Sequence, residues 1–153
     1  MIQIICVGKL KEKATQELVK EYTKRLSAYT KIEITEVNDE SNQLEDEKVK
    51  QLEGERIIRQ IRKDSFVILL DLKGRPLSSE ELSMKINEIY TYNSSNITFI
   101  IGGSLGVSEE VRSRADFLWK LSDLTFPHNL VRIILLEQIY RSYKILNHEP
   151  YHK

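Results

Sequence analysis

Three predominantly apolar runs constrain the fold of this chain more than any other feature. Phe66–Leu72 reads FVILLDL, Ile97–Ile101 reads ITFII, and Ile2–Val7 reads IQIICV. Strands that are apolar on successive residues are buried on both faces, as in a parallel sheet covered by helices. Segments with apolar residues at helical spacing lie between these runs. The alternation predicts an α/β fold, with an open, mostly parallel sheet flanked by helices.

Further elements extend the alternation along the whole chain. Ser78 and Glu81 form a capping-box pattern, Ser108 is a second helix cap, and Lys73–Pro76 is expected to be a turn. Strands are expected at Ile2–Val7, Ile32–Val37, Phe66–Leu72, Ile97–Ile101 and Phe117–Leu121. Helices are expected over Leu18–Tyr29, Leu44–Arg62, Ser78–Ile89, Ser108–Ala115 and Pro127–Leu146, with Leu18, Leu82 and Ile86 among the inward residues.

The bulk composition limits the class of protein. A length of 153 residues without a linker or internal repeat predicts a single domain, 1–153, and 41% apolar residues suffice for a core. No apolar run is long enough to span a bilayer, and Met1 leads directly into a strand pattern without a signal peptide. The single cysteine, Cys6, cannot form an internal disulfide and is expected in the core. We therefore expect a cytoplasmic protein.

Net charge is zero, with 23 basic and 23 acidic residues, which is unusual for a general nucleic-acid binder. The charges are unevenly distributed. Residues 36–47 carry six acidic side chains and no lysine or arginine, whereas residues 127–153 are basic overall and hold all three histidines. If the chain binds RNA, this asymmetry points to its C-terminal end.

A glycine-rich segment, Gly102–Gly106, follows the strand at Ile97–Ile101 and precedes a helix. Ligands of open α/β sheets bind at the carboxyl ends of strands, and glycines allow close approach of the backbone. The pattern is not GxGxxG, and no acidic residue ends the following strand to hold a ribose. The segment is therefore either a ligand-binding loop or a tight turn.

The segment after the fifth strand ends at the last helix. Thr125 is a candidate helix cap, and Pro127 suits a first helical turn. His128 then lies near the positive end of the helix dipole, which favours a neutral imidazole able to accept a proton. A surface histidine near a helix end is the more common alternative.

Two arginines lie on opposite sides of the last helix. Arg132 shares a face with Leu136, Ile139 and Tyr143, so it requires a partner: a core carboxylate, a second subunit or a substrate. Arg141 lies on the charged stripe, where the pattern favours a solvated side chain. In the final residues, Tyr151 and His152 are suited to contacts with a base and phosphates. No metal-ligand spacing, P-loop or nucleophile elbow is present.

These residues together resemble one family, the RlmH family of bacterial ribosomal large-subunit pseudouridine N3-methyltransferases of the SPOUT class. The resemblance covers the full chain. It rests on motifs that occur in the family's order: Gly8-Lys9-Leu10-Lys11, Leu70 before a Lys-Gly turn, Ile101-Gly102-Gly103-x-x-Gly106, Thr125-Phe126-Pro127-His128 with Val131-Arg132, Glu137-Gln138-x-Tyr140-Arg141, and Pro150-Tyr151-His152-Lys153.

The resemblance implies a SPOUT fold with a C-terminal trefoil knot, a rare exception to unknotted topology. It implies a homodimer with its active site at the interface, acting on N3 of a pseudouridine in 23S rRNA of the assembled ribosome. The methyl donor would be S-adenosylmethionine. The residues that the resemblance assigns to the donor are Leu70, Gly102, neighbouring Gly103, Leu121, Ser122, Asp123, Leu124, Thr125 and Phe126.

Methyl transfer to an imide nitrogen requires loss of a proton, so the reaction needs a base or a cation that stabilises the anion. We assign the electrostatic role to Arg132 or Arg141, base positioning to Tyr151 and His152, and proton acceptance or support of the cofactor loop to His128. Three alternatives remain: a SPOUT enzyme acting on another RNA such as tRNA, a catalytically silent ribosome- or nucleotide-binding module, and a small-molecule α/β enzyme.

Overall fold

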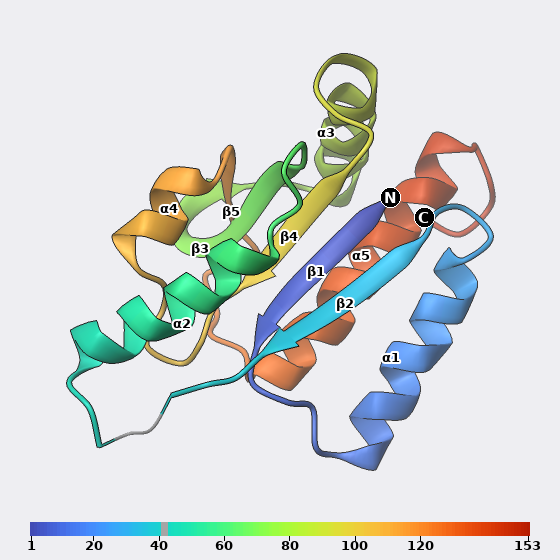
Figure 1. The fold of residues 1–153 in the computed structure, drawn as a ribbon. Helices are drawn as coiled ribbons and strands as arrows, with labels where there is room; N and C mark the ends of the chain where they lie inside the picture. The colour runs from blue at the N-terminus through green and yellow to red at the C-terminus, as the bar shows by residue number, and fades with distance from the viewer. Residues whose placement is uncertain (41–42) are drawn as a thin grey trace.

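The computed structural model describes residues 1–40 and 43–153 of the chain. Five strands alternate with five helices along the chain, and the strands form one sheet (Figure 1). The strands are β1 (Ile2–Val7), β2 (Ile32–Val37), β3 (Phe66–Pro76), β4 (Ile97–Ile101) and β5 (Phe117–Lys120). The helices are α1 (Lys13–Leu26), α2 (Asp46–Gln60), α3 (Ser79–Tyr92), α4 (Glu109–Arg114) and α5 (His128–Leu146).

The strands lie in the order β2-β1-β4-β3-β5, and every pairing between them is parallel. The predicted α/β class with an open parallel sheet is therefore confirmed. Helices α1, α3 and α5 cover one face of the sheet, and α2 and α4 cover the other (Figure 1). Burial on both faces explains why the central strands are continuous apolar runs.

Two core clusters hold these layers together. The larger one joins Phe99 and Trp119 of the sheet to Ile86 of α3 and Leu136 of α5. The smaller one joins the opposite sheet face to α2 and α4. Cys6 belongs to the larger cluster, and burial raises the pKa of its thiol to about 12, so it is an inert core residue as predicted.

Helix caps follow the sequence in two places. Ser78 and Glu81 form the reciprocal capping box of α3, and the Ser108 hydroxyl accepts a hydrogen bond from the Val111 N–H at the start of α4. The predicted cap at Thr125 is wrong. Helix α5 begins at His128, so its N-cap residue is Pro127, which makes no side-chain cap hydrogen bond. Thr125 is left free to face a cavity.

Two further expectations were wrong. Lys73–Pro76 is not a separate turn but the end of β3, because Arg75 and Pro76 resume the pairing with β5 after an irregularity that begins at Leu70. Leu18 was expected to face the core, but it is 45% exposed, since α1 lies at the edge of the molecule over β2. The trefoil knot stays a prediction.

Candidate active site

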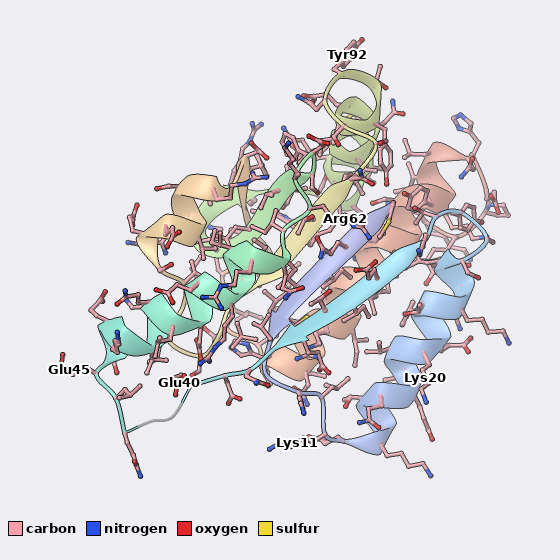
Figure 2. All side chains as sticks on the ribbon, in the orientation of Figure 1. Lys11, Lys20, Glu40, Glu45, Arg62 and Tyr92 are labelled. Carbon is pink, nitrogen blue, oxygen red and sulfur yellow. The ribbon has the colours of Figure 1, made fainter. Side chains whose placement is uncertain are left out.

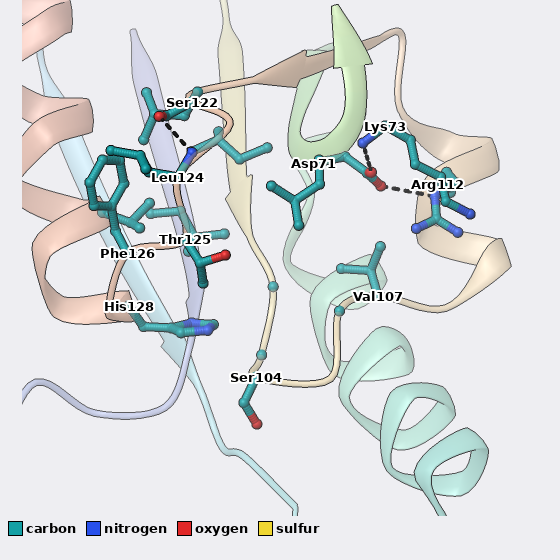
Figure 3. Close-up of a pocket in the computed structure, with 18 residues that line it drawn as sticks. Asp71, Lys73, Ser104, Val107, Arg112, Ser122, Leu124, Thr125, Phe126 and His128 are labelled. Atoms are coloured by element: carbon teal, nitrogen blue, oxygen red, sulfur yellow. Dashed lines mark hydrogen bonds and ion pairs between the residues drawn. The ribbon is translucent and has the colours of Figure 1, made fainter.

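A cavity of about 360 Å³ opens at the carboxyl edge of the sheet, where β4, β3 and β5 end side by side. Figure 3 shows the segment from Ser122 to His128 on one side of the cavity and Asp71, Val107 and Arg112 on the other. The lining residues are Leu70, Asp71, Leu72, Lys73, Ile101, Gly102, Gly103, Ser104, Gly106, Val107, Arg112, Leu121, Ser122, Leu124, Thr125, Phe126, His128 and Val131. Its size and its place at the strand ends suit a small-molecule ligand.

One wall of the cavity is formed by Leu121, Ser122, Leu124, Thr125 and Phe126. Among the described residues, the N–H groups of Ser122–Phe126 make one hydrogen bond, from the Leu124 N–H to the Ser122 hydroxyl at 3.0 Å. The other backbone N–H groups of this segment have no hydrogen-bond partner among the described residues, which leaves them available to a ligand.

The opposite rim is the glycine loop, which folds back on itself between Gly103 and Gly106. A Cβ atom at Gly102 would lie 2.6 Å from the Val107 side chain, and one at Gly103 would lie 2.6 Å from the Glu53 carboxylate. The loop therefore requires glycine because Val107 and the buried Glu53 lie directly against its backbone. The glycine loop is thus both a tight turn and part of the cavity wall.

An ion pair that the sequence did not indicate lies on the third wall. Asp71, whose side chain is 7% exposed, accepts a hydrogen bond from Arg112 Nε at 2.9 Å and from the Lys73 N–H at 2.8 Å. Both side chains line the cavity. The position of Asp71, immediately after the buried part of β3, is the signal in the sequence that could have indicated it.

The structure brings most of the predicted donor-binding residues to this cavity: Leu70, Gly102, Gly103, Leu121, Ser122, Leu124, Thr125 and Phe126. Asp123 is the exception. It is exposed, does not line the cavity, and forms an ion pair with Lys120 at 2.7 Å. Asp123 therefore provides a control position beside the cavity.

His128 is the first residue of α5 and lines two adjacent cavities. No hydrogen bond joins its ring to any residue that the structure describes. In the interpretation from sequence, a neutral imidazole near the helix start could accept a proton. An unpartnered ring at the cavity wall is consistent with that role.

Arg132 has a carboxylate partner within the same chain. It is 6% exposed, and it donates to Glu36 at the end of β2 at 2.5 Å and to the Gly8 carbonyl at 2.7 Å. Burial alone would raise the pKa of Glu36, but hydrogen bonds from Arg132 and the Leu10 N–H outweigh it and lower that pKa. Of the three partners considered for Arg132, the structure shows a carboxylate of the same chain, but Glu36 is exposed and does not belong to the core.

We predict that Glu36→Gln lowers the free energy of unfolding at neutral pH by about 2 kcal/mol, discounted from the value for a buried pair because Glu36 is 34% exposed. Because the pKa of Glu36 is lowered in the folded protein, this stabilisation is fully present above about pH 4.5, the ordinary pKa of the group. It is lost as the pH falls through the pKa of Glu36 in the folded protein. Urea unfolding at about pH 7 and about pH 3.5 tests both statements, because the deficit should be smaller at the lower pH.

Glu33→Gln is the control, because Glu33 lies on the same strand in an exposed pair with Arg62 and should cost below about 0.5 kcal/mol. Equal costs for the two variants, or a deficit as large in acid as at neutral pH, would contradict the predicted role of Glu36.

Arg141 of α5 forms a cluster with Tyr151 and His152 of the C-terminal tail, next to α3. Arg141 donates to Glu137 from Nε at 3.0 Å and Nη2 at 2.7 Å, and its guanidinium lies 4.8 Å from the centre of the Tyr151 ring. His152 contacts Arg141 Nη1 through Nδ1 at 3.1 Å and Glu80 through Nε2 at 2.6 Å. The C-terminal residues are therefore docked, and Arg141 is not the solvated charge that its helical position suggested.

These contacts set the protonation states of the cluster. A guanidinium only donates, so Nδ1 of His152 accepts and Nε2 carries the proton towards Glu80. The hydrogen bond to Glu137 raises the pKa of Arg141, which stays cationic. Burial and the Glu137 carboxylate raise the pKa of Tyr151, which stays neutral. Sequence reasoning missed Glu80 because its partner, His152, lies in the C-terminal tail. The Glu137–Arg141 pair has i, i+4 spacing on α5 and could have been predicted from the sequence.

The cluster and the cavity lie at different places on α5. Arg141 follows His128 by 13 residues, which corresponds to about 20 Å along the helix. None of Arg141, Tyr151 and His152 lines the cavity. Within one chain, the structure therefore does not bring the predicted substrate-facing residues to the predicted donor site.

The predicted basic patch of the C-terminal segment is largely neutralised. Arg132 pairs with Glu36, Arg141 with Glu137, and Lys144 with Glu149. Within residues 1–40 and 43–153, no group of histidine, cysteine and acidic side chains could hold a metal ion, and no helix is long and apolar enough to cross a membrane.

Comparison with known proteins identifies the family. Residues 1–152 match the family described as "Predicted SPOUT methyltransferase". The ribosomal RNA large subunit methyltransferase H of Acetivibrio thermocellus is 49% identical, and that of Carboxydothermus hydrogenoformans is 53% identical, each over 157 residues that cover 99% of both chains.

A solved structure, a probable methylase family protein from Haemophilus influenzae Rd KW20, aligns with a TM-score of 0.56. At 12% identity, over 99% of this chain and 70% of that one, it supports the fold alone. The full-length matches in sequence carry the assignment further. The chain belongs to the SPOUT methyltransferase family, among the ribosomal RNA large subunit methyltransferase H proteins.

Proposed function

We propose that this chain transfers a methyl group from S-adenosylmethionine to N3 of a pseudouridine in 23S rRNA of the assembled ribosome. The observation that carries the proposal is the cavity at the carboxyl edge of the sheet, walled by free backbone groups, in a chain of this family. The relatives are named as ribosomal RNA large subunit methyltransferases, which supports ribosomal RNA as the substrate and the cytoplasm as the location.

The cavity fits the methyl donor in size and chemistry. Its volume of about 360 Å³ lies within the range of small-ligand sites. Leu70, Val107 and Phe126 supply apolar walls, and the free N–H groups of residues 122–126 suit the polar edge of a purine. The sulfonium of the bound donor supplies an activated methyl group, so the protein must supply alignment and proton removal.

Each reacting group then has a candidate role. Arg141 stabilises the anion that forms when N3 loses its proton, since its charge is held in place by Glu137. Tyr151 and His152 position the base. His152 is not assigned as the proton acceptor, because both of its ring nitrogens already have partners. His128 is the proton acceptor, since its ring is unpartnered and lines the cavity. Arg132 is a positioning residue, because Glu36 and the Gly8 carbonyl occupy its guanidinium.

A homodimer completes the site in this proposal. The separation of about 20 Å along α5 between His128 and Arg141 supports an arrangement in which the tail of one subunit serves the donor cavity of the other. Exposed leucines lie at the cavity and its glycine loop, with Leu72 at 65%, Leu105 at 42% and Leu124 at 69% exposure. An apolar rim of this kind suits an interface between two copies of the chain.

A methyl-transfer assay with labelled S-adenosylmethionine tests the proposal against its alternatives. Purified ribosomes from cells that lack the protein should accept label, and tRNA should not. Transfer to tRNA would favour another RNA target, and failure of the donor to bind in calorimetry would favour a catalytically silent module. A pair of variants at the cavity, Thr125→Trp and Asp123→Trp, links any activity to this site.

Thr125 is exposed and lines the cavity, so an indole at this position fills the donor site without disturbing the core (Figure 3). We expect Thr125→Trp to lose donor binding and transfer. Asp123→Trp should keep both, because Asp123 does not line the cavity. Equal behaviour of the two variants would place the donor elsewhere.

A further inference from the structure

A second cavity of about 280 Å³ lies beside the first, between the β1–α1 connection and the start of α5. Residues 7–12 form one side, and His128, Asn129 and Arg132 form the other. His128 lines both cavities and so separates the proposed donor site from this second space. The Gly-Lys-Leu-Lys segment at residues 8–11 has no role in the proposed transfer reaction.

The buried Arg132 organises this segment. It donates to the Gly8 carbonyl, and its partner Glu36 accepts a hydrogen bond from the Leu10 N–H at 2.8 Å. Gly8 has a φ of +89°, a conformation that L side chains rarely adopt. The segment is therefore held in one shape from beneath, with Lys9 and Lys11 exposed on either side of Leu10.

The cavity is electropositive where these groups meet. Neither Lys9 nor Lys11 forms an ion pair or hydrogen bond with any residue that the structure describes. Helix α5 starts with no side-chain cap and no acidic residue in its first turn, so the positive end of its dipole is uncompensated.

Two further observations bear on a ligand. Arg132 is 6% exposed and lines the cavity, and its Nε has no hydrogen-bond partner among the described residues. The one carboxylate in the lining is Glu12, whose Oε1 accepts from Asn129 at 3.4 Å. A second acid, Glu36, lies outside the lining but pairs with Arg132 and is close enough to Lys9 for its charge to act on that carboxylate. Lys9, Lys11 and Arg132 still outnumber Glu12 and Glu36, and the helix start adds partial positive charge, so the cavity favours an anion.

We propose that this second cavity binds one backbone phosphate of the RNA substrate, next to the nucleotide that is methylated. The inference rests on the proposed function, because the shared wall at His128 is what places the phosphate beside the reacting base. A phosphodiester suits the site because helix starts and lysines bind phosphate through N–H groups and charge, without reading the base. This local site lets a chain of zero net charge hold RNA in register.

The test measures binding of purified large ribosomal subunits at several salt concentrations. Lys9→Ala with Lys11→Ala should weaken binding about tenfold at physiological salt and reduce the slope of log affinity against log salt by roughly one, the value for one phosphate. Both lysines are exposed, so the variant should fold. Lys20→Ala with Lys24→Ala is the control of equal charge, since both lie on α1 away from the cavity; Figure 2 labels Lys11 and Lys20.

The outcomes separate this inference from the proposed function. If the wild-type protein methylates ribosomes but the Lys9 and Lys11 variant binds them as the control does, the phosphate site is wrong and the function stands. If the variant shows the weakened binding and reduced slope but the wild-type protein transfers no methyl group, the site stands and the function is wrong. Binding of inorganic phosphate alone, with ribosome affinity unchanged, would also overturn the inference. Calorimetry should give the same donor affinity for both lysine variants.

Discussion

Replacing Arg141 with alanine is expected to lower the rate constant of methyl transfer by about 10²–10³-fold, the usual cost of removing one preorganised group that stabilises a developing anion. Three of the five guanidinium N–H groups are committed to Glu137 and His152, which leaves two for the substrate. Single-turnover transfer to purified ribosomes measures the rate. Calorimetry should show donor affinity within about twofold of wild type, because Arg141 does not line the donor cavity.

Arg141→Lys refines this result. It keeps the charge but cannot reproduce two hydrogen bonds to Glu137 together with one to His152, so it should recover only part of the rate. Arg59→Ala, which removes an exposed arginine on α2, should transfer at the wild-type rate. Full activity of the Arg141→Ala enzyme would contradict the proposal that Arg141 stabilises the N3 anion.

A mixture of two inactive variants is expected to regain activity. In a homodimer whose sites combine the cavity of one subunit with the tail of the other, a heterodimer of Thr125→Trp and Arg141→Ala has one intact site. Random exchange makes half of the dimers heterodimers, each with one working site of two, so about one quarter of wild-type activity should return. The prediction follows from the separation of His128 and Arg141 on α5.

Co-expression of the two variants with different affinity tags allows the heterodimer to be isolated and assayed directly. Purified heterodimer should then reach about half of the wild-type rate, because one of its two sites is intact. Each variant exchanged only with itself serves as the control and should stay inactive. A heterodimer as inactive as its parents would show that the tail serves its own chain, and a strictly monomeric protein in light scattering would exclude a shared site.

Sequence reasoning located the sheet and the cavity because both depend on local patterns. Continuous apolar runs identify buried strands, and the segments that follow Ile101 and Lys120 must meet at the carboxyl edge of a parallel sheet. These patterns made the glycine loop a candidate ligand-binding loop, whereas residues 121–126 were assigned to the donor only by the resemblance to the family. What these patterns could not provide was which neighbouring strand each segment meets.

The ion pairs were missed for that reason. Glu36 reaches Arg132, 96 residues away, because the strand order places β2 beside β1 and the end of β2 near Gly8. Glu80 reaches His152 only because α3 packs against α5. A helical wheel shows which face Arg141 occupies, but it cannot show that the C-terminal tail folds over that face. Long-range partners thus require the topology, which periodicity alone does not specify.

The central claim is that this chain methylates one base in ribosomal RNA through the cavity at the carboxyl edge of its sheet. Mass spectrometry of RNA from ribosomes that lacked the modification, after incubation with the protein and S-adenosylmethionine, tests it most directly. One 3-methylpseudouridine in 23S rRNA, produced by the wild-type protein and by Asp123→Trp but not by Thr125→Trp, is the expected result. A methyl group on tRNA, on another atom, or produced equally by Thr125→Trp would contradict the claim.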